Sequence, residues 1–370
     1  MWPESLESAI AIVRQLLYRS IKLAKSTVKP QQTFRLSLVG GETLLGRDIK
    51  EVLEERSKQT RISTYPVSAE GNFSEQEGEP VYLEPLSADS LRDTPVLVLA
   101  GSTAGSAKGL GIAQSLKPKP LVLDATGVLA GEKEARLIAP LLSEVKPTAG
   151  QLLVVAHPAA TALALVLGRL SNHKTITSSL ANIFAPASER GSRGIDELHR
   201  QTSALLAFKT LPREVFDAQL AFNLLPQLGE DSALPLPPLE ERIQRELHLL
   251  GAQSKKAAAV HNHSLRLIQA PVFHGYAISL YVEFASKISR KDLEEALASA
   301  QVEVRSLGED VPTNPDAAGT TGVIAGDIRP ALGNPKAAWF WLVCDNYRII
   351  SDAVTDVVNT LASTEGPEHR

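Results

Sequence analysis

The stretch from residue 152 to residue 161, LLVVAHPAAT, has a layout that suits a catalytic nucleophile. Four branched apolar residues and Ala156 predict a buried strand; His157 and Pro158 end it, and residues 161–170 predict a helix. A side chain at position 160 would lie at the helix N-terminus, where unpaired N–H groups and the positive end of the dipole favour ionisation of a thiol. The position suits a cysteine, and this chain has Ala160 there.

Two other residues are candidates for the chemistry of a thiol or a base. Cys344 is the only cysteine, and it lies near Trp341 in an apolar run that predicts a strand, where a structural thiol is the ordinary outcome. His274 stands two positions before Tyr276, so on a strand the two side chains would share a face. His274 is therefore either a base on that face or a loop histidine without a chemical role.

The remaining histidines give no clear site. His261 and His263 have the spacing of two ligands on one strand face, but no third ligand accompanies them, so we predict a solvated surface and no metal site. His157 directly precedes a predicted helix and suits the role of a helix cap.

A glycine turn follows the first predicted strand, residues 34–39. Residues 40–46, GGETLLG, lead into a helix, and strand, glycine turn and helix in this order are typical of a dinucleotide site, where the helix N-terminus holds a pyrophosphate. Gly40 and Gly46 are present, but Thr43 replaces the middle glycine of G-x-x-G-x-x-G. Two interpretations stay open: a turn that binds NAD(P), or a turn that keeps only the shape.

The second predicted strand, residues 61–65, does not select a cofactor. An acidic residue at its end would bind a ribose 2′-hydroxyl and favour NAD, whereas Pro66 and Val67 stand there, so NADP is preferred only by default. Gly101 begins a run of small residues after the predicted strand at residues 96–100. That run either leaves room for a ligand or forms a tight turn.

The elements that must position these residues fall into two groups. Apolar runs at residues 96–100, 121–124 and 152–156 are separated by helical or loop segments, which predicts a mostly parallel, doubly wound α/β sheet. Residues 71–80 are expected to form a solvated loop.

After residue 170 the pattern is that of an α+β unit. Residues 174–180 predict a polar-faced strand and residues 195–209 a helix, while residues 276–284 alternate with their apolar positions on one face. Residues 339–344 predict a last strand, and the final helix follows it.

Composition limits the classes of function. The chain has 370 residues, enough for two domains, with 44% hydrophobic and 22% charged residues, as in a globular protein with a full core. The net charge of −4 gives no reason to expect a nucleic-acid partner. A single cysteine excludes an internal disulfide framework and favours a cytoplasmic location.

Residues 1–30 predict an additional N-terminal helix with an apolar stripe. The apolar run at residues 9–13 is far shorter than the ~18 residues that a transmembrane segment needs. We expect this helix to pack on its own protein or on a protein partner, with binding to a membrane surface as the alternative. Residues 363–370 are expected to form a loose tail.

From residue 34 to residue 361 the order of segments resembles the aspartate-semialdehyde dehydrogenase family. The resemblance rests on five blocks, which together are far more specific than the glycine turn. They are GIDEL at residues 194–198 with Gln201 and Thr202, QLAFNLLP at 219–226, QAPVFHG at 269–275, Pro312 and Thr313 with DAAG at 316–319, and VCDN with Arg348 at 343–348. The middle blocks are most similar to the Usg-type branch, whose members are regarded as non-catalytic.

The resemblance implies the reductive dephosphorylation of an aspartyl phosphate with NADPH through a cysteine thioester. Such a reaction needs a thiolate, an acid–base group, a donor that orients the acyl group, and a cation for the substrate carboxylate. In the family these roles fall to a cysteine, a histidine, a glutamine and an arginine. The aligned positions in this chain are Ala160 for the cysteine, Tyr276 for the histidine, Ala185 for the glutamine and Gln269 for the arginine.

The cofactor side of the resemblance is also incomplete. Asn346 matches the family's cofactor-facing turn, but Ile350 replaces a glycine, which is expected to narrow the space for the nicotinamide. Residues 125–127 replace the Asn-Ser-Ser run of the phosphate site, whereas Arg242 keeps a basic residue in place of a substrate-facing lysine. The candidate cofactor residues are Gly40, Thr43, Leu44, Leu45, Gly46, Gly101 and Asn346.

The resemblance implies a Rossmann-like NAD(P)-binding domain at residues 31–156 with 345–362, and an α+β dimerisation domain at residues 157–344. Our preferred hypothesis is a catalytically inactive, homodimeric homologue whose role is to bind a partner or a nucleotide. The alternative is an NAD(P)-dependent oxidoreductase that works on an aldehyde or oxo group without a thioester, with Tyr276 or His274 transferring protons. A third hypothesis is a scaffold that docks through residues 1–30.

Overall fold

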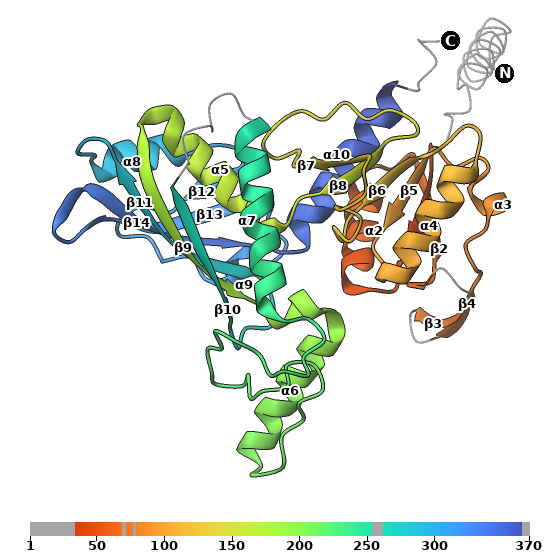
Figure 1. Cartoon of the computed structure of the whole chain (residues 1–370), viewed down its shortest axis with the longest axis horizontal. Helices are drawn as coiled ribbons and strands as arrows, with labels where there is room; N and C mark the ends of the chain where they lie inside the picture. The colour runs from red at the N-terminus through yellow and green to blue at the C-terminus, as the bar shows by residue number, and fades with distance from the viewer. Residues whose placement is uncertain (1–33, 69–71, 77–78, 254–261, 365–370) are drawn as a thin grey trace, which may run out of the picture.

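The computed structural model describes residues 34–68, 72–76, 79–253 and 262–364. The predicted N-terminal helix at residues 1–30 and the tail from residue 365 lie outside these ranges. Residues 363 and 364, assigned to the tail by the sequence, continue the last helix, α10 (Arg348–Thr364). Figure 1 shows two sheets side by side along the long axis of the molecule, with α10 at the junction between them.

The first sheet is fully parallel and has the strand order β2-β1-β5-β6-β8-β7. The interior strands β5, β6 and β8 consist of buried residues throughout, as expected when helices cover both faces. The doubly wound α/β sheet predicted from the sequence is confirmed. Its strands are β1 (Phe34–Val39), β2 (Thr60–Tyr65), β5 (Val96–Leu99), β6 (Leu121–Asp124), β7 (Ala135–Ile138) and β8 (Leu152–Val155).

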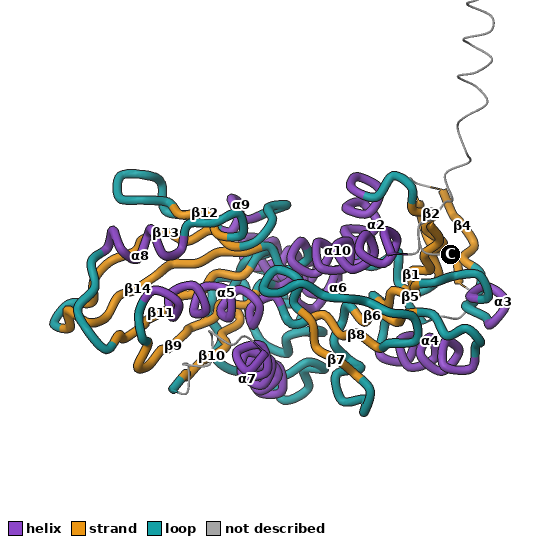
Figure 2. The backbone as a smooth tube through the Cα atoms, turned by 90° about the horizontal axis from the view of Figure 1, so that it is seen from above, coloured by secondary structure: helices purple, strands orange, loops and turns teal. Residues whose placement is uncertain are grey.

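Helices on the two faces of this sheet form separate cores. On one face α2 (Leu44–Arg56) and α10 supply Ile49, Leu53 and Val354 to a core that also contains residues of β1 and β5. On the other face α4 (Thr103–Ser115) and the short α3 (Ala88–Leu91) pack through Leu110 and Leu91. Figure 2 shows α10 and α2 on the side of the sheet opposite α4.

The second sheet is mixed, with the order β10-β9-β11-β14-β13-β12. In β11 the side chains of Ile278, Leu280, Val282 and Phe284 are buried, which confirms the predicted one-sided alternation. The strands are β9 (Ile176–Ala185), β10 (His263–Gln269), β11 (Tyr276–Phe284), β12 (Val302–Val304), β13 (Val323–Ala331) and β14 (Asn334–Cys344).

Helix α5 (Pro158–His173) begins directly after β8 and carries the chain from the first sheet to the second. Together with α7 (Leu236–Gln253) and α8 (Arg290–Leu297) it covers one face of the second sheet (Figure 2). Helix α6 (Gly191–Leu206) projects away from both sheets in Figure 1, and the short α9 (Asn314–Ala317) packs near β14.

Two further local predictions were wrong. Residues 71–80, expected to be a loop, contribute to an antiparallel pair of strands, β3 (Asn72–Gln76) and β4 (Glu79–Leu83). Helix α5 starts at Pro158 and not near residue 161, because proline is favourable in the first turn, where its missing N–H is not needed.

Candidate functional site

Position 160 lies in the first turn of α5 and is completely buried. Ala160 has an exposed fraction of 0% and belongs to the hydrophobic core between α5 and the second sheet. The turn is held by His157, whose Nδ1 accepts a hydrogen bond from the backbone N–H of Ala159 at 3.2 Å. The predicted role of His157 as a helix cap is confirmed.

His157, Glu189 and Tyr276 form a hydrogen-bond network next to this turn, in which His157 and Tyr276 are buried and the Glu189 side chain is 20% exposed. The hydroxyl of Tyr276 donates to Glu189 Oε2 at 2.8 Å, and Nε2 of His157 lies 3.3 Å from Glu189 Oε1 and 3.3 Å from the Tyr276 hydroxyl. Because Nδ1 of His157 accepts from Ala159, the proton of the neutral ring is on Nε2 and points to Glu189. The three side chains satisfy one another.

Electrostatics favours an ionised Glu189 and a neutral Tyr276. Burial acts to raise the pKa of Glu189, but His157 and the hydroxyl of Tyr276 outweigh it and lower the pKa. Burial, reinforced by the charge of Glu189, raises the pKa of Tyr276 well above its ordinary value. Tyr276 therefore retains its proton near neutral pH and is a poor acid or base.

Two of the positions aligned with catalytic residues meet at the ends of neighbouring strands. Ala185 ends β9, Gln269 ends β10, and the two are register partners. Nε2 of Gln269 donates to the carbonyl of Ala185 at 2.9 Å, and Oε1 of Gln269 accepts from Nη1 of Arg190 at 2.5 Å. The side chain of Gln269 thus links the strand end to an arginine that sequence analysis did not single out.

The basic residue on α7 is neutralised from within the protein. Nε of Arg242 donates to Glu246 Oε1 at 2.7 Å, and its Nη1 donates to the carbonyl of Thr126 at 2.9 Å. Glu246 Oε2 in turn accepts from the backbone N–H of His157 at 2.6 Å. A salt bridge to a buried carboxylate reduces the attraction of Arg242 for an external anion.

His274 belongs to a different set of contacts from Tyr276. His274 lies before the start of β11, so the expectation that its side chain shares a strand face with that of Tyr276 is wrong. Nε2 of His274 lies 2.9 Å from Asp345 Oδ1, and its Nδ1 lies 3.2 Å from the hydroxyl of Ser188. Asn346 joins the same cluster, since its Oδ1 accepts from Ser188 at 3.3 Å and from the N–H of Gly275 at 3.1 Å.

The glycine turn after β1 keeps a tightly packed backbone. Gly40 has a φ of +82°, and a Cβ there would lie 2.6 Å from the carbonyl oxygen of Ala100 and 2.6 Å from Cα of Gly101. Thr43 caps α2 by accepting from the N–H of Gly46 at 2.9 Å, and its hydroxyl donates toward the Gly40 carbonyl at 2.8 Å. Gly40, Thr43, Gly46 and Gly101 are therefore brought together.

A carboxylate lies at this turn. Glu42 Oε1 accepts from the backbone N–H of Val67, just after β2, at 2.5 Å, and Glu42 Oε2 is buried without a hydrogen-bond partner. In a doubly wound fold a dinucleotide phosphate would lie close to this turn, where a carboxylate would repel it. The turn has the shape of a dinucleotide site, but its charge does not fit an anionic cofactor.

The remaining cofactor candidates are spread over several elements. Leu44 and Leu45 form the start of α2, and Leu45 is partly buried in the core below the sheet together with Ile350. Asn346 forms hydrogen bonds with Ser188 and with the backbone of Gly275. The seven candidates thus divide into a group at the turn and Asn346 at the start of α10.

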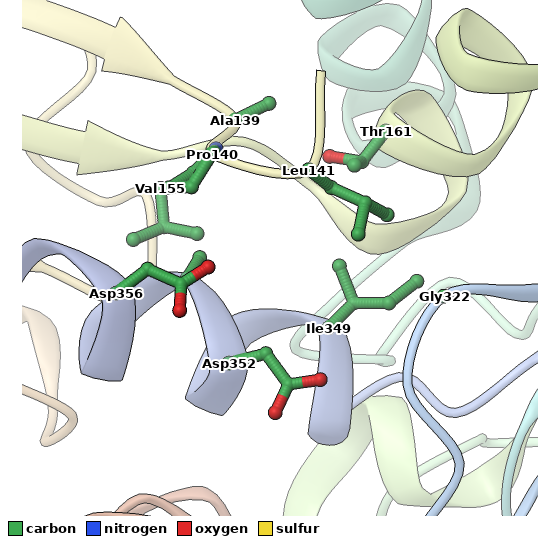
Figure 3. A pocket seen from close by; sticks show the side chains of 10 residues that line it. Ala139, Pro140, Leu141, Val155, Thr161, Gly322, Ile349, Asp352 and Asp356 are labelled. Carbon is green, nitrogen blue, oxygen red and sulfur yellow. The ribbon is translucent and has the colours of Figure 1, made fainter. Parts of the chain in front are cut away.

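A small cavity lies between the end of β8 and α10 (Figure 3). Its volume of about 10 Å³ holds about one water molecule. Side chains of Leu141 and Thr161 point into it from one side, and Ile349 and Asp352 of α10 lie on the other. This space is too small for a substrate.

Sequence analysis missed Ser188, Glu189, Arg190 and Glu246. The first three lie between Phe184 and the GIDEL block, separated from that block by three residues, so their proximity to a matched block is the one signal that could have found them. In the described ranges no three His, Cys, Asp or Glu side chains are grouped as metal ligands, and none of the described helices is long and apolar enough to cross a membrane. The solvated surface predicted for His261 and His263 is wrong at His263, which is buried against α7, and His261 lies outside the described residues.

The chain is similar in sequence to one known protein domain and to several known proteins. The semialdehyde dehydrogenase dimerisation domain matches residues 174–349. The aspartate-semialdehyde dehydrogenase of Rickettsia bellii is 26% identical over 326 residues, covering 85% of this chain and 93% of that protein. The USG-1 protein homologue of Azotobacter vinelandii is 27% identical over 325 residues, with coverages of 85% and 93%.

Solved structures share the fold. Aspartate semialdehyde dehydrogenase II of Vibrio cholerae superimposes with a TM-score of 0.73 at 20% identity, over 91% of this chain and 100% of that chain. An aspartate semialdehyde dehydrogenase from Candida albicans, solved with NADP, gives 0.63 at 11% identity, over 90% and 98%. The chain is therefore a homologue of the aspartate-semialdehyde dehydrogenases and of the USG-1 proteins, and it carries the semialdehyde dehydrogenase dimerisation domain.

Proposed function

We propose that this protein is a catalytically inactive homologue of aspartate-semialdehyde dehydrogenase that acts as a homodimeric binding protein. The observation that carries the proposal is the environment of position 160. A methyl group occupies the place suited to a nucleophile, and His157, Glu189 and Tyr276 beside it are bonded to one another. No thioester can form on alanine, and removal of a covalent nucleophile typically costs about six orders of magnitude in turnover.

The one thiol of the chain does not substitute for the nucleophile. Cys344 ends β14 and is buried, and burial raises the pKa of its thiol to about 12. Attack requires the thiolate, which is scarce at pH 7 for such a group. Cys344 supports packing of the second sheet, not catalysis.

Dimerisation through residues 157–344 is supported by the outer face of the second sheet. Leu180, Tyr281 and Trp339 are register partners on three adjacent strands, and their side chains lie on the face opposite α5 and α7. Leu180 is 42% exposed, and the rings of Tyr281 and Trp339 are 5.0 Å apart. An apolar, aromatic surface of this kind is typical of the core of a protein–protein interface.

The proposal also covers the domains, the protein partner, the cellular location and the cofactor. We assign residues 31–156 with 345–362 to a Rossmann-like domain that retains its structural role, and we expect residues 1–30 to contact a protein partner. A cytoplasmic location agrees with a chain whose single cysteine is a free thiol. NADP or NAD remains the candidate ligand of the glycine turn, although the carboxylate of Glu42 disfavours it.

A steady-state assay tests the central part of the proposal. Purified full-length protein is incubated with aspartate semialdehyde, phosphate and NADP, and formation of NADPH is followed by absorbance against heat-killed protein. A catalytic homologue, assayed in parallel, shows that the substrate is competent. We expect no rate above the heat-killed control; a rate proportional to protein concentration would refute inactivity.

The second candidate is an NAD(P)-dependent oxidoreductase that forms no thioester. The observation in its favour is the pair His274–Asp345, since the His274 side chain is 29% exposed and could exchange a proton with a ligand. It requires cofactor binding. Calorimetry with NADH and NADPH at millimolar concentrations distinguishes the candidates, because absence of binding heat would remove the oxidoreductase.

A further inference from the structure

Arg190 is a buried cation whose hydrogen-bonding capacity is largely unused. It lies in the 3-10 turn Ala187–Arg190 before α6 and is only 7% exposed. Nη1 donates to Gln269 Oε1 at 2.5 Å and Nη2 to the carbonyl of Leu234 at 2.9 Å, while Nε is buried without a partner. A guanidinium has five N–H donors, so these two contacts leave three of them unused.

The charge of Arg190 is not paired with a carboxylate among the described residues. Its two acceptors are neutral oxygens, and the face of the guanidinium lies over the ring of Phe216, with Cζ 5.5 Å from the ring centroid. The adjacent Glu189 acts on Arg190 through its charge, but it directs its two carboxylate oxygens to His157 and Tyr276 and accepts no hydrogen bond from the guanidinium. A buried charge is costly unless it is paired, so this arrangement favours an anion beside Arg190.

The unused donors have a geometry that selects among anions. Nε–H and one N–H of Nη2 run parallel along one edge of the guanidinium, which matches the two oxygens of a carboxylate. The aromatic ring of Phe216 closes one face of the guanidinium, so a planar group in the same plane fits better than a tetrahedral one.

We propose that Arg190 anchors a binding site for a small carboxylate, whose oxygens accept hydrogen bonds from Nε and Nη2. Gln269 holds the guanidinium in place from the end of β10. The carbonyl of Leu234 contacts Nη2 from the segment before α7, and the side chain of Leu234 is 57% exposed. A carboxylate would approach Arg190 from this side and accept a hydrogen bond from Nη2, either in place of the Leu234 carbonyl or in addition to it.

Isothermal titration calorimetry of the full-length protein with acetate, malonate and L-aspartate tests the site, at constant ionic strength and with chloride as the counter-ion. We expect saturable binding of at least one carboxylate. Arg190→Lys keeps the positive charge but loses the parallel N–H pair, and should weaken that binding at least tenfold. Arg200→Lys, on the exposed part of α6, is the matched control and should leave affinity unchanged.

Folding and specificity are checked in the same series. Circular dichroism and thermal unfolding test whether Arg190→Lys is folded. If it is unfolded, Gln269→Leu serves as the second variant. This change removes the acceptor that holds the Arg190 guanidinium in place and should weaken carboxylate binding at least threefold. Inorganic phosphate should compete poorly. The proposal is overturned by absence of saturable carboxylate binding to the wild type, by unchanged affinity in the folded variant, or by equal binding of phosphate.

Discussion

The hydroxyl of Tyr276 donates a 2.8 Å hydrogen bond to Oε2 of Glu189, from the first residue of β11 to the turn before α6. The resemblance to the aspartate-semialdehyde dehydrogenases aligns Tyr276 with the catalytic histidine of that family. In this chain Tyr276 belongs to a largely buried hydrogen-bond network with His157 and Glu189. These hydrogen bonds give Tyr276 a structural role in this chain, and that role has measurable consequences for stability.

Replacing Tyr276 by phenylalanine tests the network as a stabilising unit. The variant keeps the ring but leaves Oε2 of the partly buried Glu189 without its donor, and loss of a hydrogen bond to a charged group costs about 1–3 kcal/mol. Chemical denaturation should show a loss of unfolding free energy in that range. Tyr82→Phe, at a 53% exposed position on β4, is the matched control and should change stability by less than ~0.5 kcal/mol. Equal losses in the two variants would argue against the network.

Stability should fall between pH 6.5 and pH 4 because of His263. Burial, reinforced by the charge of His248, lowers the pKa of His263 from 6.5 to about 4, so the unfolded state binds a proton that the folded state does not over this interval. The stabilisation is fully present above pH 6.5 and is lost as the pH falls toward 4. Unfolding midpoints across this range should vary less in His263→Gln than in the wild type, and His199→Gln should follow the wild type. An unchanged profile in His263→Gln would contradict the assignment.

A charge on the outer face of the second sheet should disrupt the dimer. Leu180→Glu places a carboxylate beside Tyr281, and burying an unpaired charge in an interface is strongly unfavourable. Because Leu180 is 42% exposed in the protomer, the fold should tolerate the change. Light scattering after gel filtration should show a dimer for the wild type, a monomer for Leu180→Glu, and a dimer for Leu332→Glu, which alters the exposed turn between β13 and β14. A dimeric Leu180→Glu would place the interface elsewhere.

Removing the charge of Glu42 should improve dinucleotide binding. Glu42→Gln keeps the shape of the side chain near Val67 but no longer repels a phosphate. In fluorescence titrations with NADPH we expect weak or undetectable binding to the wild type and at least tenfold tighter binding to the variant. Glu84→Gln, an exposed carboxylate elsewhere in the same half of the chain, controls for the change in net charge. Equal affinity in the wild type and Glu42→Gln would show that the carboxylate does not govern the site.

The parallel sheet could be predicted from the sequence because its interior strands are buried on both faces. Such strands appear as continuous apolar runs, as at residues 96–99. It was also sufficient for β11, where alternate positions are buried. These signals are local. The β3–β4 hairpin was missed because residues 71–80 contain mainly polar residues and glycine and give no such pattern.

The candidate site could be predicted only in part. The absence of a nucleophile at Ala160 can be read from a single position once the family resemblance is known. By contrast, the partners of Tyr276 are 87 and 119 residues away in the chain, at Glu189 and His157, and no local pattern links them. The same holds for Arg190, which meets Gln269 across 79 residues. Interactions of this kind arise from the packing of distant segments.

The most direct test of a closed and inactive site is the rate of NADPH formation by Ala160→Cys in the assay with aspartate semialdehyde, phosphate and NADP. The added sulfur would lie in a buried turn beside the His157–Glu189–Tyr276 network, with no histidine at position 276 to transfer its proton. We predict no rate above that of the wild-type protein, with a loss of stability of about 1–3 kcal/mol from overpacking. Turnover by the folded variant that exceeds the wild-type rate a hundredfold would contradict the account, because it would show that the thiol alone was missing.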